Sequence, residues 1–343
     1  MLTTILSGGL IGLIFGFILQ RTRFCLTGGF RDMYIARNNT LFYAFLIAIT
    51  VESIGVLSLI QLGIIGNPYE EFSVLGAIVG SYLFGIGIVL AGGCATGTWY
   101  RAGEGLLGSG VALFFYMTSA AAMKSGFLVP LNQLIAKRWV INDDLAGQLG
   151  IPVWYLLVFL VAITSFIVIR ELRKPRRQIA TLPSKYKGVR HYLFEKTYHK
   201  YFAGFLIGLV ALIAWPASQL TGRVGGLGIT TPSAHLISYI ITGDSKQLGW
   251  GVFLVLGIFL GSFLAAKGSR EFRWRLPDLS TIGKSTLGGI FMGIGASWAG
   301  GCTIGNGLTA TAIFSSKGWI ALPVTILGVW TASHIIFVKP NKN

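Results

Sequence analysis

Long apolar runs separated by short polar segments recur along this chain of 343 residues. A helix needs about 20 mostly apolar residues to cross the hydrocarbon core of a bilayer, and nine runs approach that length. The pattern therefore predicts an all-α integral membrane protein with about nine transmembrane helices. The nine runs occupy residues 2–19, 41–64, 72–93, 104–123, 152–169, 202–219, 249–266, 285–304 and 319–338.

The composition excludes a soluble domain. Hydrophobic residues make up 53% of the chain, charged residues only 12%, and the mean hydropathy is +0.69. A soluble protein of this size could not keep so much apolar surface away from water. The first run has no basic residue ahead of it, so we interpret it as a spanning helix and not as a cleaved signal peptide. Membrane lipid is the expected surrounding, and nucleic acid is not an expected partner.

The distribution of basic residues predicts the orientation in the membrane. With the N-terminus outside, the inner segments hold 22 of the 28 Lys and Arg residues and the outer segments hold 6. Because cytoplasmic loops carry the excess of positive charge, this arrangement is favoured over the reverse. The N-terminus is therefore expected on the periplasmic side and the C-terminus in the cytoplasm.

A basic segment divides the chain into two halves. Residues 170–200 carry ten Lys or Arg residues and two Glu residues, and five apolar runs precede them. An odd number of spans makes the second half enter the membrane in the opposite direction, as in transporters built from inverted repeats. We predict a first repeat at 1–174, a basic cytoplasmic linker at 175–200 and a second repeat at 201–343.

One glycine-rich motif occurs in both halves. GIGIVLAGGCATGTWYRAGEG, residues 85–105, aligns with GIGASWAGGCTIGNG, residues 293–307, at an offset of 208, and eight positions are identical. So many glycines favour bent or re-entrant segments at mid-membrane over straight helices. The paired motifs predict a central pathway where the halves meet. The glycines directly before the two cysteines are expected to adopt positive φ or to allow close backbone approach: Gly92, Gly93, Gly300 and Gly301.

The three cysteines are the candidate reactive groups. Cys25, Cys94 and Cys302 each lie beside a glycine pair, whereas CxxC pairs and histidine clusters are absent from the sequence. This argues against a zinc site or a disulfide framework, and no metal or cofactor is expected. Helices beginning after Gly103 and after Asn306 would aim positive dipole ends at the two bends, which suits a small anion.

Four further residues near the bends are candidates, and so is one acidic residue in an apolar run. Thr96 and Asn306 lie within the bends and are candidates for the substrate pathway. Arg101 and Glu104 are possible supporting residues, and their spacing of three favours a pair between them over direct anion contact. Glu52 is most simply a buried structural carboxyl with a hydrogen-bond partner, although an intramembrane acid is also a functional candidate.

The segment TRFCLTGGFRD and the two AGGC bends together resemble the YeeE/YedE family of bacterial inner-membrane proteins. The resemblance covers nearly the whole chain. It implies an inverted-repeat helical fold of hourglass-like shape, uptake of thiosulfate, and pathway roles for Cys25, Cys94 and Cys302. It also implies a cytoplasmic partner, a TusA-like sulfurtransferase of the YeeD type.

Thiols suit such a path because thiosulfate has one soft terminal sulfur and three hard oxygens. A neutral thiol donates a weak hydrogen bond to the sulfur, while backbone amides hold the oxygens. Weak contacts release what they bind, as transport requires. Three alternatives remain open: another sulfur or selenium species as cargo, a membrane sulfurtransferase that forms a cysteine persulfide, and a thiol oxidoreductase that forms a disulfide.

Overall fold

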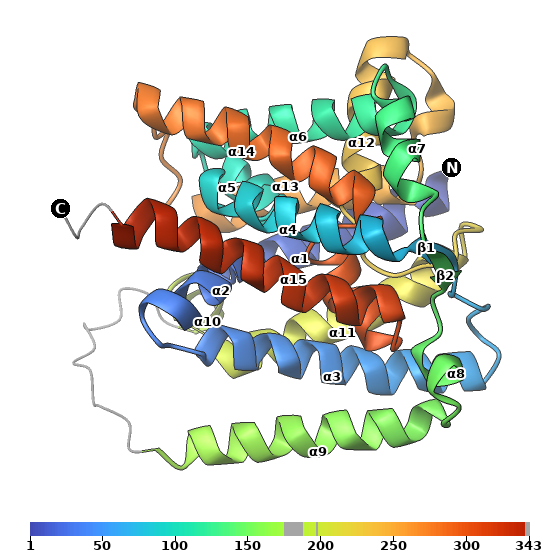
Figure 1. Ribbon diagram of the computed structural model, residues 1–343. Helices are drawn as coiled ribbons and strands as arrows, with labels where there is room; N and C mark the ends of the chain where they lie inside the picture. Colours follow the sequence, from blue (N-terminus) through green and yellow to red (C-terminus); the bar gives the residue numbers. More distant parts are fainter. Residues whose placement is uncertain (175–187, 197, 340–343) are drawn as a thin grey trace.

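The chain folds into long helices that run side by side across the molecule (Figure 1). The computed structural model describes residues 1–174, 188–196 and 198–339. Within them, strands are limited to β1 (Glu71–Ser73) and β2 (Val140–Asn142), which pair antiparallel. The all-α prediction is therefore confirmed. The long helices are α1 (Leu2–Thr22), α3 (Thr40–Gln61), α4 (Val74–Leu90), α6 (Leu107–Ser125), α9 (Val153–Leu172), α11 (Lys200–Gln219), α13 (Trp250–Gly268), α14 (Leu279–Trp298) and α15 (Ser316–Ser333).

Most of the shorter helices occupy segments that the hydropathy pattern left as loops. Several of them begin where a long helix has just ended, and glycines are frequent around them. They are α2 (Leu26–Ile35), α5 (Ala95–Gly103), α7 (Val129–Ala136), α8 (Leu145–Leu149), α10 (Val189–Phe194), α12 (Thr230–Thr242), the 3-10 turn η1 (Ser245–Gln247) and the π-helical segments η2 (Gly305–Ala310) and η3 (His334–Val338).

Each predicted apolar run coincides with one of the long helices, but the count of nine spans is not confirmed. Seven helices of the described residues are long and apolar enough to cross a membrane. An eighth span is added if α6 and α7, which meet at a bend of 73°, are taken together. Helix α14 is not among them, because Ser, Thr, Lys and Gly interrupt its apolar residues.

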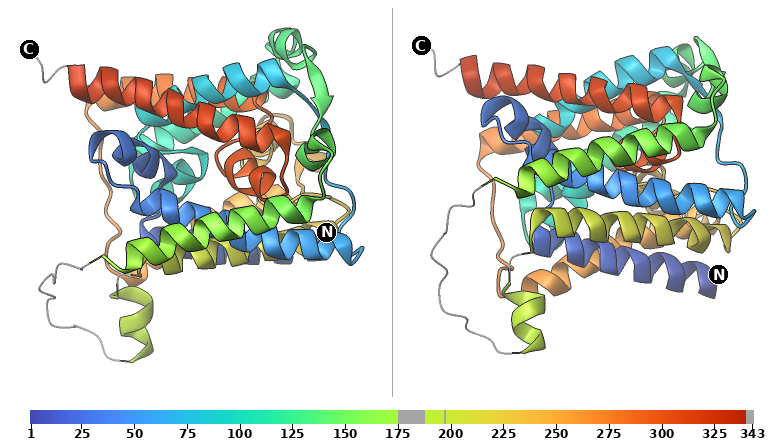
Figure 2. Two further views of the ribbon diagram at one scale, coloured as in Figure 1. Left: turned by 60° about the horizontal axis from the view of Figure 1, so that its bottom comes forward. Right: turned by 90° about the horizontal axis from the view of Figure 1, so that it is seen from below.

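Helices from the two halves pack against each other in matching pairs. Helix α1 packs on α13 and α3 packs on α11, while α4 packs on α14 in the centre. Likewise α6 packs on α14, and α4 packs on α15. Glycines allow the close approach in the first pair, because a Cβ at Gly12 would collide with the carbonyl oxygen of Leu254. Helix α9 lies outside this arrangement, along α3 (Figure 2).

The two ends of the molecule are distinct. The N-terminus lies at the end that carries β1 and β2, and the C-terminus lies at the opposite end, together with α2 and α10 (Figures 1 and 2). Residues 175–187 and 197 of the predicted linker fall outside the described residues; α10 belongs to the part that is described.

Candidate functional site

All three cysteines are buried where the helical path of the backbone is interrupted. Cys25 is the N-cap residue of α2, Cys94 is the N-cap residue of α5, and Cys302 precedes η2. Their exposed fractions are 6%, 4% and 2%, and all three are free thiols. Each thiol therefore lies at a break in the helices, inside the protein and close to backbone groups that the break leaves unpaired.

The first two thiols flank the same glycine. A Cβ built on Gly97 would lie 3.4 Å from the sulfur of Cys94 and 4.0 Å from that of Cys25. The N-termini of α2 and α5 therefore converge on one point, although Cys25 and Cys94 are far apart in the sequence. Ile229, the N-cap residue of α12, takes the place in the second half that Cys25 has in the first.

An additional helix, which the sequence did not predict, precedes the one expected after Gly103. Helix α5 starts at Ala95, directly after Cys94, and the expected helix is α6, which starts at Leu107. The backbone amide of Gly97 donates to the sulfur of Cys94 over 3.4 Å. The positive end of α5 is therefore aimed at the thiol itself, which strengthens the argument for an anion at this point.

The two AGGC bends have the same backbone geometry. Gly92 and Gly300 both have a φ of +69°, a conformation that residues with a Cβ rarely adopt. At Gly301 a Cβ would collide with the side-chain oxygen of Asn306. Gly93 has neither feature, because a Cβ there would meet only ordinary contacts, the nearest being Arg101 Nη1 at 3.5 Å. The expected backbone role is confirmed at three of the four glycines.

We expect Gly92→Ala to lower the stability of the protein by about 1 kcal/mol, because a Cβ at positive φ is strained. The matched control is Gly110→Ala in α6. A Cβ at either position meets no atom within 4 Å, so the two substitutions differ in backbone strain and not in packing. Melting temperatures in detergent should fall for Gly92→Ala and stay level or rise for Gly110→Ala. Equal melting temperatures would show that the bend tolerates a side chain.

Polar side chains donate hydrogen bonds to the backbone of the two bends. A guanidinium nitrogen of Arg101 donates to the carbonyl oxygen of Gly92. The side-chain amide of Asn306 donates to the carbonyl oxygens of Ala299 at 2.8 Å and Gly301 at 3.3 Å. Arg101 and Asn306 thus play matching roles in the two halves, which the sequence did not reveal.

The expected pair between Arg101 and Glu104 is not formed. Glu104 instead accepts from Arg23 at 2.5 Å, and Arg23 also bonds Glu271 at 2.9 Å. Gln20 donates to Glu271 at 2.9 Å as well. This cluster lies near the end of the molecule that carries the C-terminus and joins α1 and α5 to the segment before α14. A spacing of three residues favours a pair within one helix, but here Arg23 from another part of the chain binds Glu104 instead.

Glu52 has a hydrogen-bond partner at one of its two carboxyl oxygens. Its side chain is fully buried in α3 and accepts from the indole nitrogen of Trp215 in α11 over 2.9 Å. The bond joins the two halves of the molecule, which supports the interpretation of Glu52 as a structural carboxyl.

A cavity of about 350 Å³ leads from the surface to Cys302. Its lining includes the exposed Glu70, just before β1, and Asp143, just after β2, so it opens at the end of the molecule that carries the N-terminus (Figure 1). We call this cavity the vestibule. Gly300, Gly301, Asn306 and Thr309 also line it.

Two cationic side chains that the sequence analysis missed face the vestibule. Arg223 donates to the carbonyl oxygens of Gly225 and Gly226 and, among the described residues, forms no ion pair. Lys317 lies 3.8 Å from Asp143, whose carboxylate also accepts from Ser315 Oγ at 2.6 Å. Burial raises the pKa of Asp143, which these bonds partly offset. The lining therefore carries two basic and two acidic side chains, and Arg223 is the basic one that forms no ion pair among the described residues.

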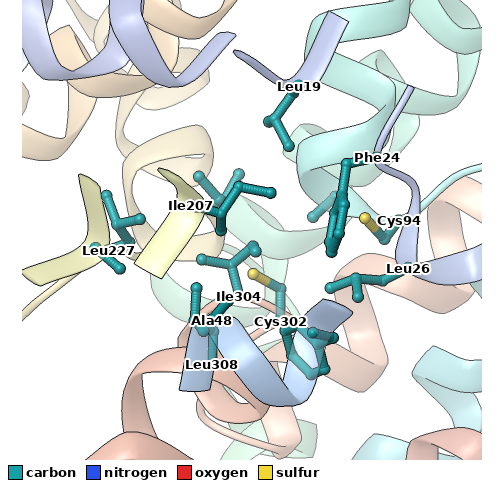
Figure 3. Packing of buried hydrophobic residues seen from close by; sticks show 14 of the residues in the cluster. Leu19, Phe24, Leu26, Ala48, Cys94, Ile207, Leu227, Cys302, Ile304 and Leu308 are labelled. Atoms are coloured by element: carbon teal, nitrogen blue, oxygen red, sulfur yellow. The ribbon is translucent and has the colours of Figure 1, made fainter. Parts of the chain in front are cut away.

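The cavities that adjoin the thiols beyond the vestibule are small. A cavity of about 10 Å³ adjoins Cys302 and Asn306, and another of about 10 Å³ adjoins Cys94 and Gly97. Each has room for about one water molecule. Apolar side chains fill the space between, with Ile304 beside Cys302 and Phe24 beside Cys94 (Figure 3). Apolar side chains therefore separate the two small cavities.

These features define a multi-pass membrane protein in which a cavity lined by charged side chains leads toward buried thiols. The chain belongs to the sulphur transport family, which matches residues 21–331 and confirms the resemblance to the YeeE/YedE proteins.

Individual relatives agree with this assignment. The thiosulfate transporter TsuA of Escherichia coli (strain K12) is 54% identical over 342 residues, which cover 100% of this chain and 97% of the relative. The thiosulfate transporter TsuA of Spirochaeta thermophila is 33% identical, with 96% and 98% covered. The probable transporter YedE of Escherichia coli is 44% identical over 96 residues, which cover 28% of this chain and 23% of the relative.

Proposed function

We propose that this protein takes up thiosulfate across the bacterial inner membrane, with its N-terminus periplasmic and its C-terminus cytoplasmic. The observation that carries the proposal is the position of the Cys302 thiol on the wall of a vestibule that is large enough for a small anion and that Arg223 also lines. The names of the two full-length relatives support the choice of cargo. Under this orientation the vestibule faces the periplasm, and α2 and α5 lie toward the cytoplasm.

The anion moves through weak contacts. Its soft sulfur accepts from the thiol of Cys302, then from those of Cys94 and Cys25 near Gly97, while the amides at the start of α5 attract its oxygens. The cavities at the thiols are too small for the ion, so the helices around them must separate for passage. Because the ion passes unchanged in such a relay, we propose a transporter and not an enzyme.

We also propose the division into inverted repeats, residues 1–174 and 201–343, joined by the basic linker 175–200. The matching helix pairs support it. Helix α1 of the first half packs on α13 of the second half, and their counterparts, α11 and α3, pack on each other in the same way. The equal φ angles of Gly92 and Gly300 support it as well. A pseudo-twofold axis would then pass between the two AGGC bends.

A cytoplasmic TusA-like sulfurtransferase is the proposed acceptor. Carrying a dianion into a negatively charged cell costs about 4.6 kcal/mol per 100 mV for the two charges. Consumption of thiosulfate at the inner face offsets part of that cost, because it keeps the free concentration there low. The basic linker suits an acidic partner and anionic lipid alike.

Uptake by purified protein tests the proposed function. Proteoliposomes with a positive-inside potential should accumulate radiolabelled thiosulfate, whereas equal concentrations of sulfate or sulfite should accumulate slowly and compete weakly. Protein-free liposomes give the background. Accumulation of sulfite or sulfate at the rate of thiosulfate would contradict the proposed cargo.

Arg223 is a vestibule cation without an ion pair among the described residues, so Arg223→Gln should raise the KM for thiosulfate roughly tenfold, a change of about 1.4 kcal/mol in affinity. Arg223→Lys should retain part of the effect. The control is Lys246→Gln, which removes a positive charge from the exposed turn η1, outside the vestibule lining. The wild-type KM should also rise with salt, since salt screens the attraction. Equal KM values for Arg223→Gln and Lys246→Gln would refute a local role.

A further inference from the structure

Each of the three cysteines is followed within two residues by a threonine whose hydroxyl has no hydrogen-bond partner among the described residues. The hydroxyl oxygens of Thr27, Thr96 and Thr303 are buried and have no hydrogen-bond partner among the described residues. The exposed fractions of these side chains are 5%, 3% and 3%. Because nearly all buried polar atoms in folded proteins are paired, three such hydroxyls next to three thiols call for an explanation.

Neighbouring threonines are paired in the usual way. Thr98, two residues after Thr96 in the same helix, donates to the carbonyl oxygen of Ala95 over 2.7 Å. Thr309 donates to the carbonyl oxygen of Leu227 over 3.0 Å. Thr96 lies in the first turn of α5, where no carbonyl of a preceding turn is in reach, so its hydroxyl stays available.

Two of the three hydroxyls share a small cavity with a thiol. Thr96 and Cys94 line the cavity at Gly97, and Thr303 and Cys302 line the cavity at Asn306. At about 10 Å³ each, these cavities bring thiol and hydroxyl to the same narrow point. Thr27 lines neither cavity.

We propose that Thr96 and Thr303 bind the oxygen atoms of the transported anion at the two narrow points. Each narrow point then offers a soft partner, the thiol, and a hard partner, the hydroxyl. The inference rests on the proposed function, because thiosulfate is an ion that carries both kinds of atom. A site with buried polar groups discriminates strongly against ligands that leave those groups unpaired. Sulfate leaves the thiol unmatched, and a sulfur species without oxygens leaves the hydroxyl unmatched.

Valine and serine substitutions test the two hydroxyls. Valine has nearly the shape of threonine but no hydroxyl, and serine keeps the hydroxyl but lacks the methyl group. We expect Thr96→Val and Thr303→Val to reduce thiosulfate uptake into proteoliposomes roughly tenfold each, the usual effect of one lost hydrogen bond. Their melting temperatures should remain level or rise, because an unpaired buried hydroxyl is removed. Thr96→Ser and Thr303→Ser should restore most of the uptake.

Thr98→Val is the matched control. It removes a paired hydroxyl from the same helix as Thr96, so its melting temperature should fall while its uptake stays near that of the wild type. Normal thiosulfate uptake by Thr96→Val and Thr303→Val, next to active wild-type protein, would overturn the inference and leave the proposed function standing. Serine variants as inactive as the valine variants would also overturn it. Wild-type protein that fails to take up thiosulfate would overturn the proposed function, and this inference with it.

Discussion

Cys94→Ala and Cys302→Ala are expected to abolish thiosulfate uptake while the protein stays folded in the membrane. Both thiols are buried beside cavities with room for about one water molecule, which the passing ion must displace. Leaving the sulfur of the ion without a donor there costs about 2 to 3 kcal/mol, so uptake should fall roughly a hundredfold. The measurement is the initial rate of labelled thiosulfate uptake, normalised to the amount of folded protein.

Serine variants at the same positions show what the thiols do. Serine keeps a hydrogen-bond donor but cannot form a persulfide or a disulfide. Partial uptake by Cys94→Ser and Cys302→Ser is expected if the thiols only donate hydrogen bonds. We expect Cys25→Ala to be milder, because the thiol of Cys94 remains on the other side of Gly97. Full activity of Cys94→Ala at a normal protein level would contradict the relay.

Gly12→Leu is expected to prevent stable folding. A Cβ at this position would collide with the carbonyl oxygen of Leu254, so α1 and α13 would have to move apart along their whole contact. Overpacking of this kind costs about 3 kcal/mol or more, and the two helices belong to different halves. The amount of protein in the membrane and its melting temperature should both fall sharply.

Gly9→Leu is the matched control in the same helix. A Cβ at Gly9 meets no atom within 4 Å, so a leucine there is expected to be tolerated. If both variants lower the melting temperature equally, α1 is sensitive to any added side chain and the packing of α1 on α13 is not the cause.

The sequence predicted the long helices and the two bends because both leave strong local signals. An apolar run of bilayer length is unmistakable in composition, and the AGGC motif repeats at a fixed offset. It did not predict α2 and α5, which have 10 and 9 residues. Helices this short depend on tertiary packing for their stability, and the glycines around them resemble loop residues.

The vestibule could not be predicted for a different reason. Its lining comes from segments around Glu70, Asp143, Arg223 and Lys317, which only the packed fold brings together. The same holds for Glu104, whose partner Arg23 is 81 residues away in the chain. The unpaired hydroxyls of Thr96 and Thr303 are likewise invisible in the sequence, because an absent hydrogen bond is a property of the whole environment.

The most direct test of the central claim is to follow both sulfur atoms of the ion through the protein. Thiosulfate labelled with one isotope in the outer sulfur and another in the inner sulfur is supplied to proteoliposomes, and both labels are measured inside. The proposed transport of intact ions predicts equal amounts of the two labels inside and no label bound to the protein. In the alternative chemistry a thiolate attacks the outer sulfur, the S–S bond breaks, and sulfite leaves with the electron pair. Outer label retained as a cysteine persulfide, with the inner label released outside as sulfite, would contradict the account.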